Sequence, residues 1–173
     1  LLDPVPGIRG IETWSGGAGI IEGAQHDPYS ETAIVALPFD TQLIKKEIVL
    51  GHWLSSNNNK SSNNENEIIV NQKMFESLKN PEIGKRYILK TKSLAIPVIL
   101  AGVVKEFAQK KIYMDKAWFN AIANPENKIK YLMIMSENKG LSNIIKLEKE
   151  IEKAIEITNI GVQNVESQSE LMK

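Results

Sequence analysis

The chain contains no cysteine, which excludes disulfide bonds, thiolate metal sites and a thiol nucleophile. It also has no excess of charge of either sign, because 21 lysine and arginine residues balance 21 aspartate and glutamate residues. This balance argues against a strongly basic nucleic-acid-binding protein and against a polybasic membrane patch. The absence of cysteine leaves the compartment open, since cytosolic and extracytoplasmic domains can both lack it.

Long apolar runs are missing as well. The longest one, residues 94–104, is far shorter than the roughly 20 residues that a membrane helix needs. It contains Pro97 and Gly102 and is rich in β-branched residues, so it predicts a buried strand. The first residues have neither the basic region nor the hydrophobic region of a signal peptide.

The 173 residues, 42% of them hydrophobic, are enough for one domain or for two small lobes. Apolar periodicity and turn residues predict a mixture of strands and helices. Strands are expected at residues 8–14, 32–37, 48–50, 68–70, 86–90, 94–106, 112–114, 130–135 and 162–165. Helices are expected at residues 71–78, 115–122 and 141–157, with a single helical turn at residues 40–43.

Polar residues mark where these elements begin and end. The expected helix N-caps are Asp40, Asn71 or Gln72, Asp115 and Ser142. Residues 15–19, Ser-Gly-Gly-Ala-Gly, are expected to break the first strand. Residues 55–67 are rich in Asn and Ser and are expected to form a mobile loop. The strands at residues 32–37 and 130–135 are expected to be buried.

The order of these elements predicts an α+β fold. The tail reads as strand, helix, strand, and the head as a helix remnant followed by two strands, which together favour a ferredoxin-like split βαβ lobe. This lobe comprises residues 1–46 and 111–173, with its first helix truncated. A mostly β lobe, residues 47–110, is inserted into it.

No catalytic motif stands out. Residues 15–19 lack the lysine and the following helix of a phosphate loop, and no Gly-Xaa-Ser-Xaa-Gly elbow occurs. His26-Asp27 is the only adjacent histidine–carboxylate pair, and His52 is the only other histidine, so a zinc site is not expected. We therefore predict no catalytic, cofactor-binding or metal-ligating residues and no cofactor.

The three tryptophans offer one further surface. Trp14, Trp53 and Trp118 could form an aromatic binding surface, but Trp53 and Trp118 lie in apolar surroundings, which favours core packing. Trp14 borders the glycine-rich segment and is the best candidate for partial exposure.

The order and spacing of several short motifs between residues 6 and 165 resemble those of one family. The motifs are Pro6-Gly7-Ile8, Gly10-Ile11-Glu12-Thr13-Trp14, Asp40-Thr41-Gln42-Leu43, Leu50-Gly51-His52-Trp53-Leu54, Ile69-Val70-Asn71-Gln72, Ala101-Gly102-Val103-Val104-Lys105-Glu106 and Ile112-Tyr113-Met114. The chain resembles the MacB-type periplasmic core domain of FtsX-like ABC transporter permeases. His52 departs from the pattern, because the family usually carries arginine there, so no role is carried over to it.

This resemblance implies an extracytoplasmic domain that lies between two membrane helices of a permease, with a porter-like lobe and a sabre-like lobe. It implies a non-enzyme that binds a partner or cargo and transmits conformational change driven by a cytoplasmic ATPase subunit. The implied partners are that ATPase, a second permease copy or homologue in a homo- or heterodimer, and an extracytoplasmic protein, but no nucleic acid. We expect the lobes to move about joins near residues 45–47 and 108–111.

Two alternatives remain open. The chain could be a free-standing periplasmic or surface binding protein, and hydrophobic helices flanking it in the gene would decide for the permease. It could also be an enzyme that uses His26-Asp27, in which case His26→Ala would abolish a pH-dependent turnover.

Overall fold

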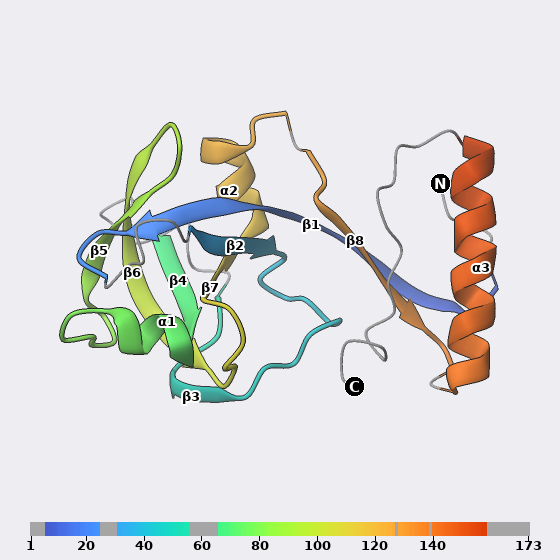
Figure 1. Cartoon of the computed structure of the whole chain (residues 1–173), viewed down its shortest axis with the longest axis horizontal. Helices are drawn as coiled ribbons and strands as arrows, with labels where there is room; N and C mark the ends of the chain where they lie inside the picture. The colour runs from blue at the N-terminus through green and yellow to red at the C-terminus, as the bar shows by residue number, and fades with distance from the viewer. Residues whose placement is uncertain (1–5, 25–30, 56–65, 127, 139, 159–173) are drawn as a thin grey trace. The chain divides into compact units, whose positions relative to one another are not determined.

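The computed structural model describes residues 6–24, 31–55, 66–126, 128–138 and 140–158. Within these ranges the chain forms eight strands and three helices (Figure 1), which confirms the α+β class. The strands are β1 (Ile8–Ile21), β2 (Thr32–Leu37), β3 (Ile48–Gly51), β4 (Asn66–Asn71), β5 (Arg86–Lys90), β6 (Ala95–Val104), β7 (Lys111–Asp115) and β8 (Tyr131–Ser136). The helices are α1 (Gln72–Ser77), α2 (Lys116–Ala123) and α3 (Leu141–Thr158).

The chain divides into two compact units. The larger is Glu12–Leu132, and the smaller combines Leu1–Ile11 with Met133–Lys173. These boundaries differ from the predicted ones at residues 46/47 and 110/111. The reason is strand pairing: β2 and β7, which were expected in the porter-like lobe, join the same sheet as β4, β5 and β6.

Six strands of the larger unit pair in a closed circuit. β1 pairs with β2, β2 with β7, β7 with β4, β4 with β6, β6 with β5, and β5 with β1. The β2–β7 and β4–β6 pairs are parallel and the other four are antiparallel. β3 adds to β6 outside this circuit. Closure leaves each strand of the circuit with neighbours on both sides, which removes the exposed edges of an open sheet.

The core of the larger unit is built from side chains of these strands and of α1 and α2. Its buried members are Ile21, Ile34, Ala36, Ile68, Val70, Met74, Leu78, Leu89, Val98, Leu100, Val103, Ile112, Met114 and Phe119. Because they come from segments distributed along the unit's sequence, the unit can fold only after distant strands have met.

Two predicted caps are confirmed. Asn71 accepts a hydrogen bond from the Met74 amide at 3.0 Å and begins α1, and Asp115 accepts one from the Trp118 amide at 3.0 Å and begins α2. Each carboxamide or carboxylate satisfies one of the amides that a first helical turn leaves without a partner.

Two other predicted caps are wrong. No helical turn forms at residues 40–43; instead the Thr41 amide bonds to the Pro38 carbonyl at 3.1 Å in a turn. Ser142 lies inside α3, which begins at Leu141. There the Gly140 carbonyl accepts the Asn143 and Ile144 amides at 3.0 Å each.

The glycine-rich segment is also not a break, because β1 continues through residues 15–19 to Ile21. A Cβ atom on Gly16 would lie 2.7 Å from the Ile34 carbonyl oxygen, and one on Gly19 would lie 2.9 Å from that of Lys90. Two of these glycines therefore permit close approach of neighbouring backbone rather than a turn.

The remaining differences concern burial and extent. β2 is not buried throughout as expected, because Ala33 and Val35 are partly exposed. The other four residues of the strand are buried. In β8, Tyr131 and Leu132 are each 43% exposed, because this strand pairs with β1 alone and ends the strand order. β4 begins at Asn66, within the predicted loop of residues 55–67. The rest of that loop, residues 56–65, and the predicted strand at residues 162–165 lie outside the described residues.

The smaller unit contains the first part of β1, most of β8, and α3. Within it the Glu137 amide donates to the Gly7 carbonyl at 2.8 Å. Leu147 and Ile151 are the buried positions of α3, four residues apart on one face, as the predicted helical periodicity requires.

Candidate functional site

Two of the recognised motifs meet at the Glu12 carboxylate. It accepts hydrogen bonds from the Trp14 indole Nε1 at 2.9 Å, from the Gln42 amide at 2.8 Å and from the Thr41 hydroxyl. The segment at residues 10–14 is thus tied to the segment at residues 40–43. Burial by itself would raise the pKa of Glu12, but the bonds from Thr41, Trp14 and Gln42 outweigh it and lower that pKa. The ionised Glu12 carboxylate accepts all of these hydrogen bonds and so holds the two segments together.

A second junction joins the Gly51 corner to β6. Gly51 has a φ of +70°, and a Cβ atom added at this position would lie 2.0 Å from the Ala101 carbonyl oxygen. A Cβ atom on Gly102 would lie 2.3 Å from the His52 carbonyl oxygen. The His52 amide donates to the Ala101 carbonyl at 3.1 Å. Glycine is needed on both strands, because any side chain would push them apart.

The third junction is a largely buried charge cluster around Glu106. Its carboxylate contacts Lys111 Nζ at 2.6 Å and Lys46 Nζ at 3.4 Å, and it accepts a hydrogen bond from the Tyr113 hydroxyl. Burial opposes ionisation of Glu106, but the bonds from Lys111 and Tyr113 and the charge of Lys46 lower its pKa. Burial and the adjacent Glu106 raise the pKa of Tyr113. The tyrosine therefore stays a neutral donor to the carboxylate.

Further contacts extend this cluster. Asn71 accepts the Lys111 amide at 3.1 Å and donates to the Gln109 carbonyl at 2.8 Å. The ring of Trp53 lies 6.0 Å from that of Tyr113. Lys105 Nζ pairs with Glu47 at 3.0 Å. Residues 45–47 and 105–111, which include both predicted joins, are therefore bound to each other within the larger unit.

Of the two histidines, the structure describes only His52. His26-Asp27 lies outside the described residues. His52 is half-exposed, with its Nε2 3.8 Å from a Glu67 carboxylate oxygen and its Nδ1 2.7 Å from the Trp53 carbonyl oxygen. Among the residues that the structure describes, no group of three or more His, Asp or Glu side chains could hold a metal ion.

The tryptophans do not form an exposed surface. Trp14, the expected exposed one, is 6% exposed, because its strand continues through the glycine segment and its indole is bonded to Glu12. Trp118 packs against the core of the larger unit, as predicted, and Trp53 against Tyr113.

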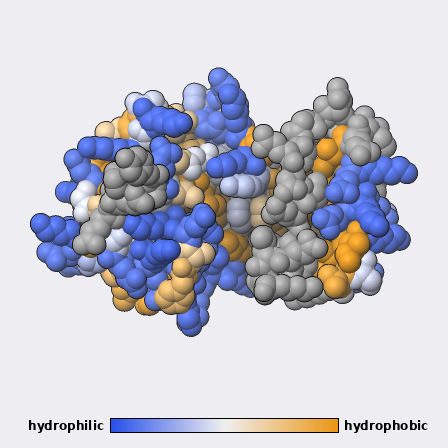
Figure 2. Space-filling view, viewed as in Figure 1, coloured by the Kyte–Doolittle hydropathy of each residue, from blue (hydrophilic) through white to orange (hydrophobic). Residues whose placement is uncertain are grey.

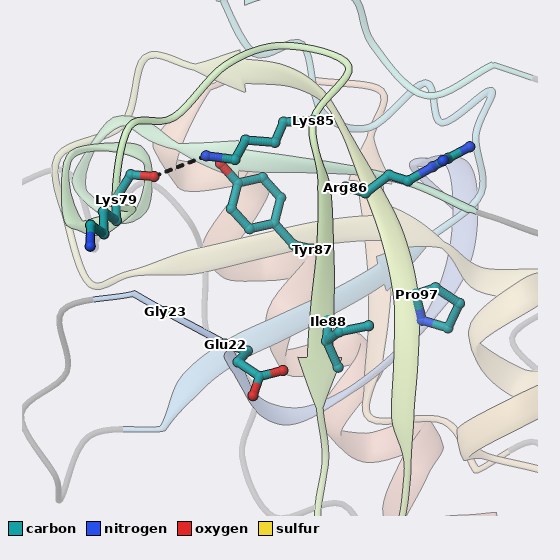
Figure 3. A pocket seen from close by; sticks show the side chains of 8 residues that line it. All are labelled: Glu22, Gly23, Lys79, Lys85, Arg86, Tyr87, Ile88 and Pro97. Atoms are coloured by element: carbon teal, nitrogen blue, oxygen red, sulfur yellow. Dashed lines mark hydrogen bonds between the residues drawn. The ribbon is translucent and has the colours of Figure 1, made fainter.

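A shallow depression of about 450 Å³ lies beside β5 (Figure 3). It is lined by Glu22, Gly23, Lys79, Lys85, Arg86, Tyr87, Ile88 and Pro97. The ammonium of Lys85 donates to the carbonyls of Lys79 and Asn80, at 3.1 and 2.8 Å, and lies 5.5 Å from the Tyr87 ring centroid. These contacts hold Lys85 in the wall of the depression. Nucleophile, base and orienting group are not assembled there as catalysis requires.

In the described parts of the chain, no helix is both long enough and apolar enough to cross a membrane.

Comparison with known proteins identifies the fold. The chain is similar to the extracellular domain of the noncanonic ABC-type transporter YknZ from Gram-positive bacteria, at 16% identity and a TM-score of 0.62. That match covers 90% of this chain and 79% of the other. It is also similar to the periplasmic region of MacB from Actinobacillus actinomycetemcomitans, at 13% identity and a TM-score of 0.55, over 88% and 70% of the two chains. No protein-family model and no curated protein matches the sequence.

The chain therefore has the MacB-type periplasmic-domain fold, which confirms the resemblance drawn from the motifs. Sequence reasoning missed the Glu106 cluster, although its residues Lys46, Glu106, Lys111 and Tyr113 are visible in the sequence. The available signal was Glu106, a carboxylate two residues after the end of an apolar strand. Its partners, however, come from segments up to 60 residues away, which local patterns do not connect.

Proposed function

We propose that the chain is the extracytoplasmic domain of an ABC transporter permease, with no catalysis of its own. It binds a partner or cargo and transmits conformational change driven by a cytoplasmic ATPase, within a permease homo- or heterodimer. The observation that carries this proposal is the shared fold with the YknZ extracellular domain over 90% of the chain. The anchoring roles of the recognised motifs agree with a scaffold rather than an active site.

The strand connections between the units support the transmission of motion. β1 and β8 each contribute residues to both units, so the chain passes between the units only within these two strands. In the larger unit the Lys130 amide donates to the Trp14 carbonyl at 2.9 Å, and in the smaller unit the Glu137 amide donates to the Gly7 carbonyl. From the first bond to the second, the residue number falls by seven on one strand, from Trp14 to Gly7, and rises by seven on the other, from Lys130 to Glu137. This is the register of one antiparallel ladder. Force applied to one unit would reach the other along this pair of strands.

Distance measurements between spin labels test the proposal in the intact permease. One label goes on α1, at Lys73→Cys in the larger unit, and the other on α3, at Lys149→Cys in the smaller unit; both side chains are exposed. The chain has no native cysteine that would compete for the label. We expect the distance distribution to differ between the nucleotide-free and the vanadate-trapped ATPase.

The matched control carries Lys73→Cys with Lys92→Cys, both in the larger unit and both exposed. Its distance should be the same in the two states. If the inter-unit distance also stays the same, the domain is a rigid docking platform, and the transmission part of the proposal is wrong. If the natural protein that contains this chain has no membrane-spanning permease segments, the whole proposal is wrong.

A further inference from the structure

Large apolar side chains are exposed around β3 and the loop that follows β6. Val49 and Leu50 are each 44% exposed and Phe107 is 65% exposed. Figure 2 shows hydrophobic side chains gathered at the lower edge of the larger unit, where Figure 1 draws β3. Exposed apolar residues that gather in one place mark interaction sites more often than scattered ones do.

Backbone pairing brings these residues to one edge of the unit. The Lys105 amide donates to the Glu47 carbonyl at 2.9 Å, and Ile48 lies opposite Val104. β3 therefore begins beside the start of the loop that carries Phe107. Among the described strands, only β6 pairs with β3. The other edge of β3 can thus offer backbone donors and acceptors to an extended segment.

The charges at this edge have one predominant sign. Residues 45–50 and 105–111 contain five lysines and two glutamates, although the whole chain is neutral. The lysines are Lys45, Lys46, Lys105, Lys110 and Lys111. This count gives a local excess of positive charge. Within it, Glu106 pairs with Lys46 and Lys111, and Glu47 pairs with Lys105. We call Val49, Leu50, Phe107 and these five lysines the β3 surface.

We propose that the β3 surface binds an extended, acidic segment of an extracytoplasmic partner protein. The apolar side chains of the segment pack on Leu50 and Phe107, its carboxylates face the exposed Lys45 and Lys105, and its backbone bonds to the free edge of β3. This names the chemistry of the partner that the proposed function requires. Binding can be tested on the isolated chain, however, so it can fail or succeed independently of any movement in the permease.

Two other occupants fit less well. A second copy of the chain would place two lysine-rich edges against each other, and like charges in contact disfavour such a pair. A lipid surface would use the lysines and Phe107, but it has no backbone groups that could pair with a strand edge.

The probe is a short synthetic peptide in which valine alternates with glutamate, labelled with a fluorophore. We expect saturable binding to the chain by fluorescence anisotropy, weakened at high ionic strength. Backbone amide NMR signals should shift at Val49, Leu50 and Phe107 and stay unchanged in the hairpin between β5 and β6. A peptide with lysine in place of glutamate should not bind.

Leu50→Glu should weaken binding by about tenfold or more, because it opposes the peptide's charge and removes an apolar contact. The matched control is Leu94→Glu, the same substitution at a similar exposure of 39%, in the hairpin between β5 and β6. It should bind like the wild type. Equal affinities of the two variants, or equal binding of the lysine peptide, would overturn the proposal.

The rival occupants are measured in the same series. Sedimentation of the chain alone tests for a dimer that Leu50→Glu dissolves, and flotation with phosphatidylglycerol vesicles tests for lipid binding. Either result without peptide binding would assign the β3 surface to that other occupant. Failure of the spin-label experiment would leave a positive peptide result intact, and the reverse also holds.

Discussion

Gly102 shows how a single missing side chain can determine a junction. A valine there would place its Cβ atom 2.3 Å from the His52 carbonyl oxygen, which is a backbone atom and cannot rotate aside as a flexible side chain can. Overpacking of this kind costs about 1–3 kcal/mol. A Cβ atom on Gly17 would meet the Phe119 ring at 3.4 Å, which is an ordinary contact.

Gly102→Val is therefore expected to lower the unfolding free energy more than Gly17→Val does. Gly17 lies within β1, where an added side chain would meet only the Phe119 ring. Urea unfolding followed by far-UV circular dichroism measures the difference. Equal midpoints for the two variants would argue against the close crossing of β3 and β6.

Glu106 makes stability depend on pH. Its pKa in the folded protein lies below the ordinary value of 4.5. Between these two values the unfolded chain binds more protons than the folded one, so the stabilisation is present above about pH 4.5 and is lost as the pH falls toward the folded pKa. The Glu12 pKa is lowered too and acts in the same direction.

Glu106→Gln should cost about 1–3 kcal/mol near neutral pH, because Lys46 and Lys111 lose their charged partner but keep partial access to water. It should also flatten the decrease in melting temperature between neutral and acidic pH. Scanning calorimetry over this range checks both effects. If the melting temperature of the variant falls with pH as steeply as that of the wild type, Glu106 has the same pKa in the folded and unfolded states.

At the scale of elements, Asn71 links three parts of the larger unit. Its side chain caps α1, accepts the first amide of β7 and donates to the loop before β7. The Asp115 side chain caps α2 by accepting a hydrogen bond from the Trp118 amide. The two positions therefore separate the effect of capping from the effect of connecting elements.

Asn71→Ala should destabilise the chain more than Asp115→Ala. Loss of a cap costs about 0.5–2 kcal/mol, and leaving the Lys111 amide without its partner adds about 1–3 kcal/mol. Chemical denaturation of both variants gives the comparison. Similar losses would mean that water replaces Asn71 at the start of β7.

For the whole molecule, we expect no saturable binding of ATP, Mg²⁺ or Zn²⁺ at micromolar concentrations. The sequence has no Walker motif, no thiol and two histidines, and the described residues hold no metal-binding group of three. Isothermal titration of each ligand into the chain is the test. A stoichiometric isotherm would contradict the proposal of a non-catalytic domain.

The hinge expected near residues 45–47 and 108–111 does not coincide with a boundary between the two compact units. Ion pairs join residues 45–47 to residues 105–106, and further bonds join Lys111 and Gln109 to the same cluster. The connections between the compact units lie instead within β1 and β8. Any movement between the units has to bend or twist those two strands.

Much of the secondary structure could be predicted from local patterns. The apolar runs of β4, β6 and β7, the periodicity of α3 and the caps Asn71 and Asp115 depend on neighbours along the chain. Residues 15–19 were misread, because glycines in a turn and glycines under close backbone contact look alike until the second strand is known. Asp40 was misread because the Glu12 carboxylate, 28 residues earlier, organises that segment.

By itself the sequence determined the α+β class, most elements and, through the order of its motifs, the MacB-type fold, since these depend on residue type and spacing. The tertiary structure alone decided the boundaries of the units, the closed circuit of strands, the Glu106 cluster and the burial of Trp14. The physical reason is that strand pairing and buried charge pairs join residues far apart in the chain. Their free energy depends on which distant partner arrives, and no local pattern records that partner.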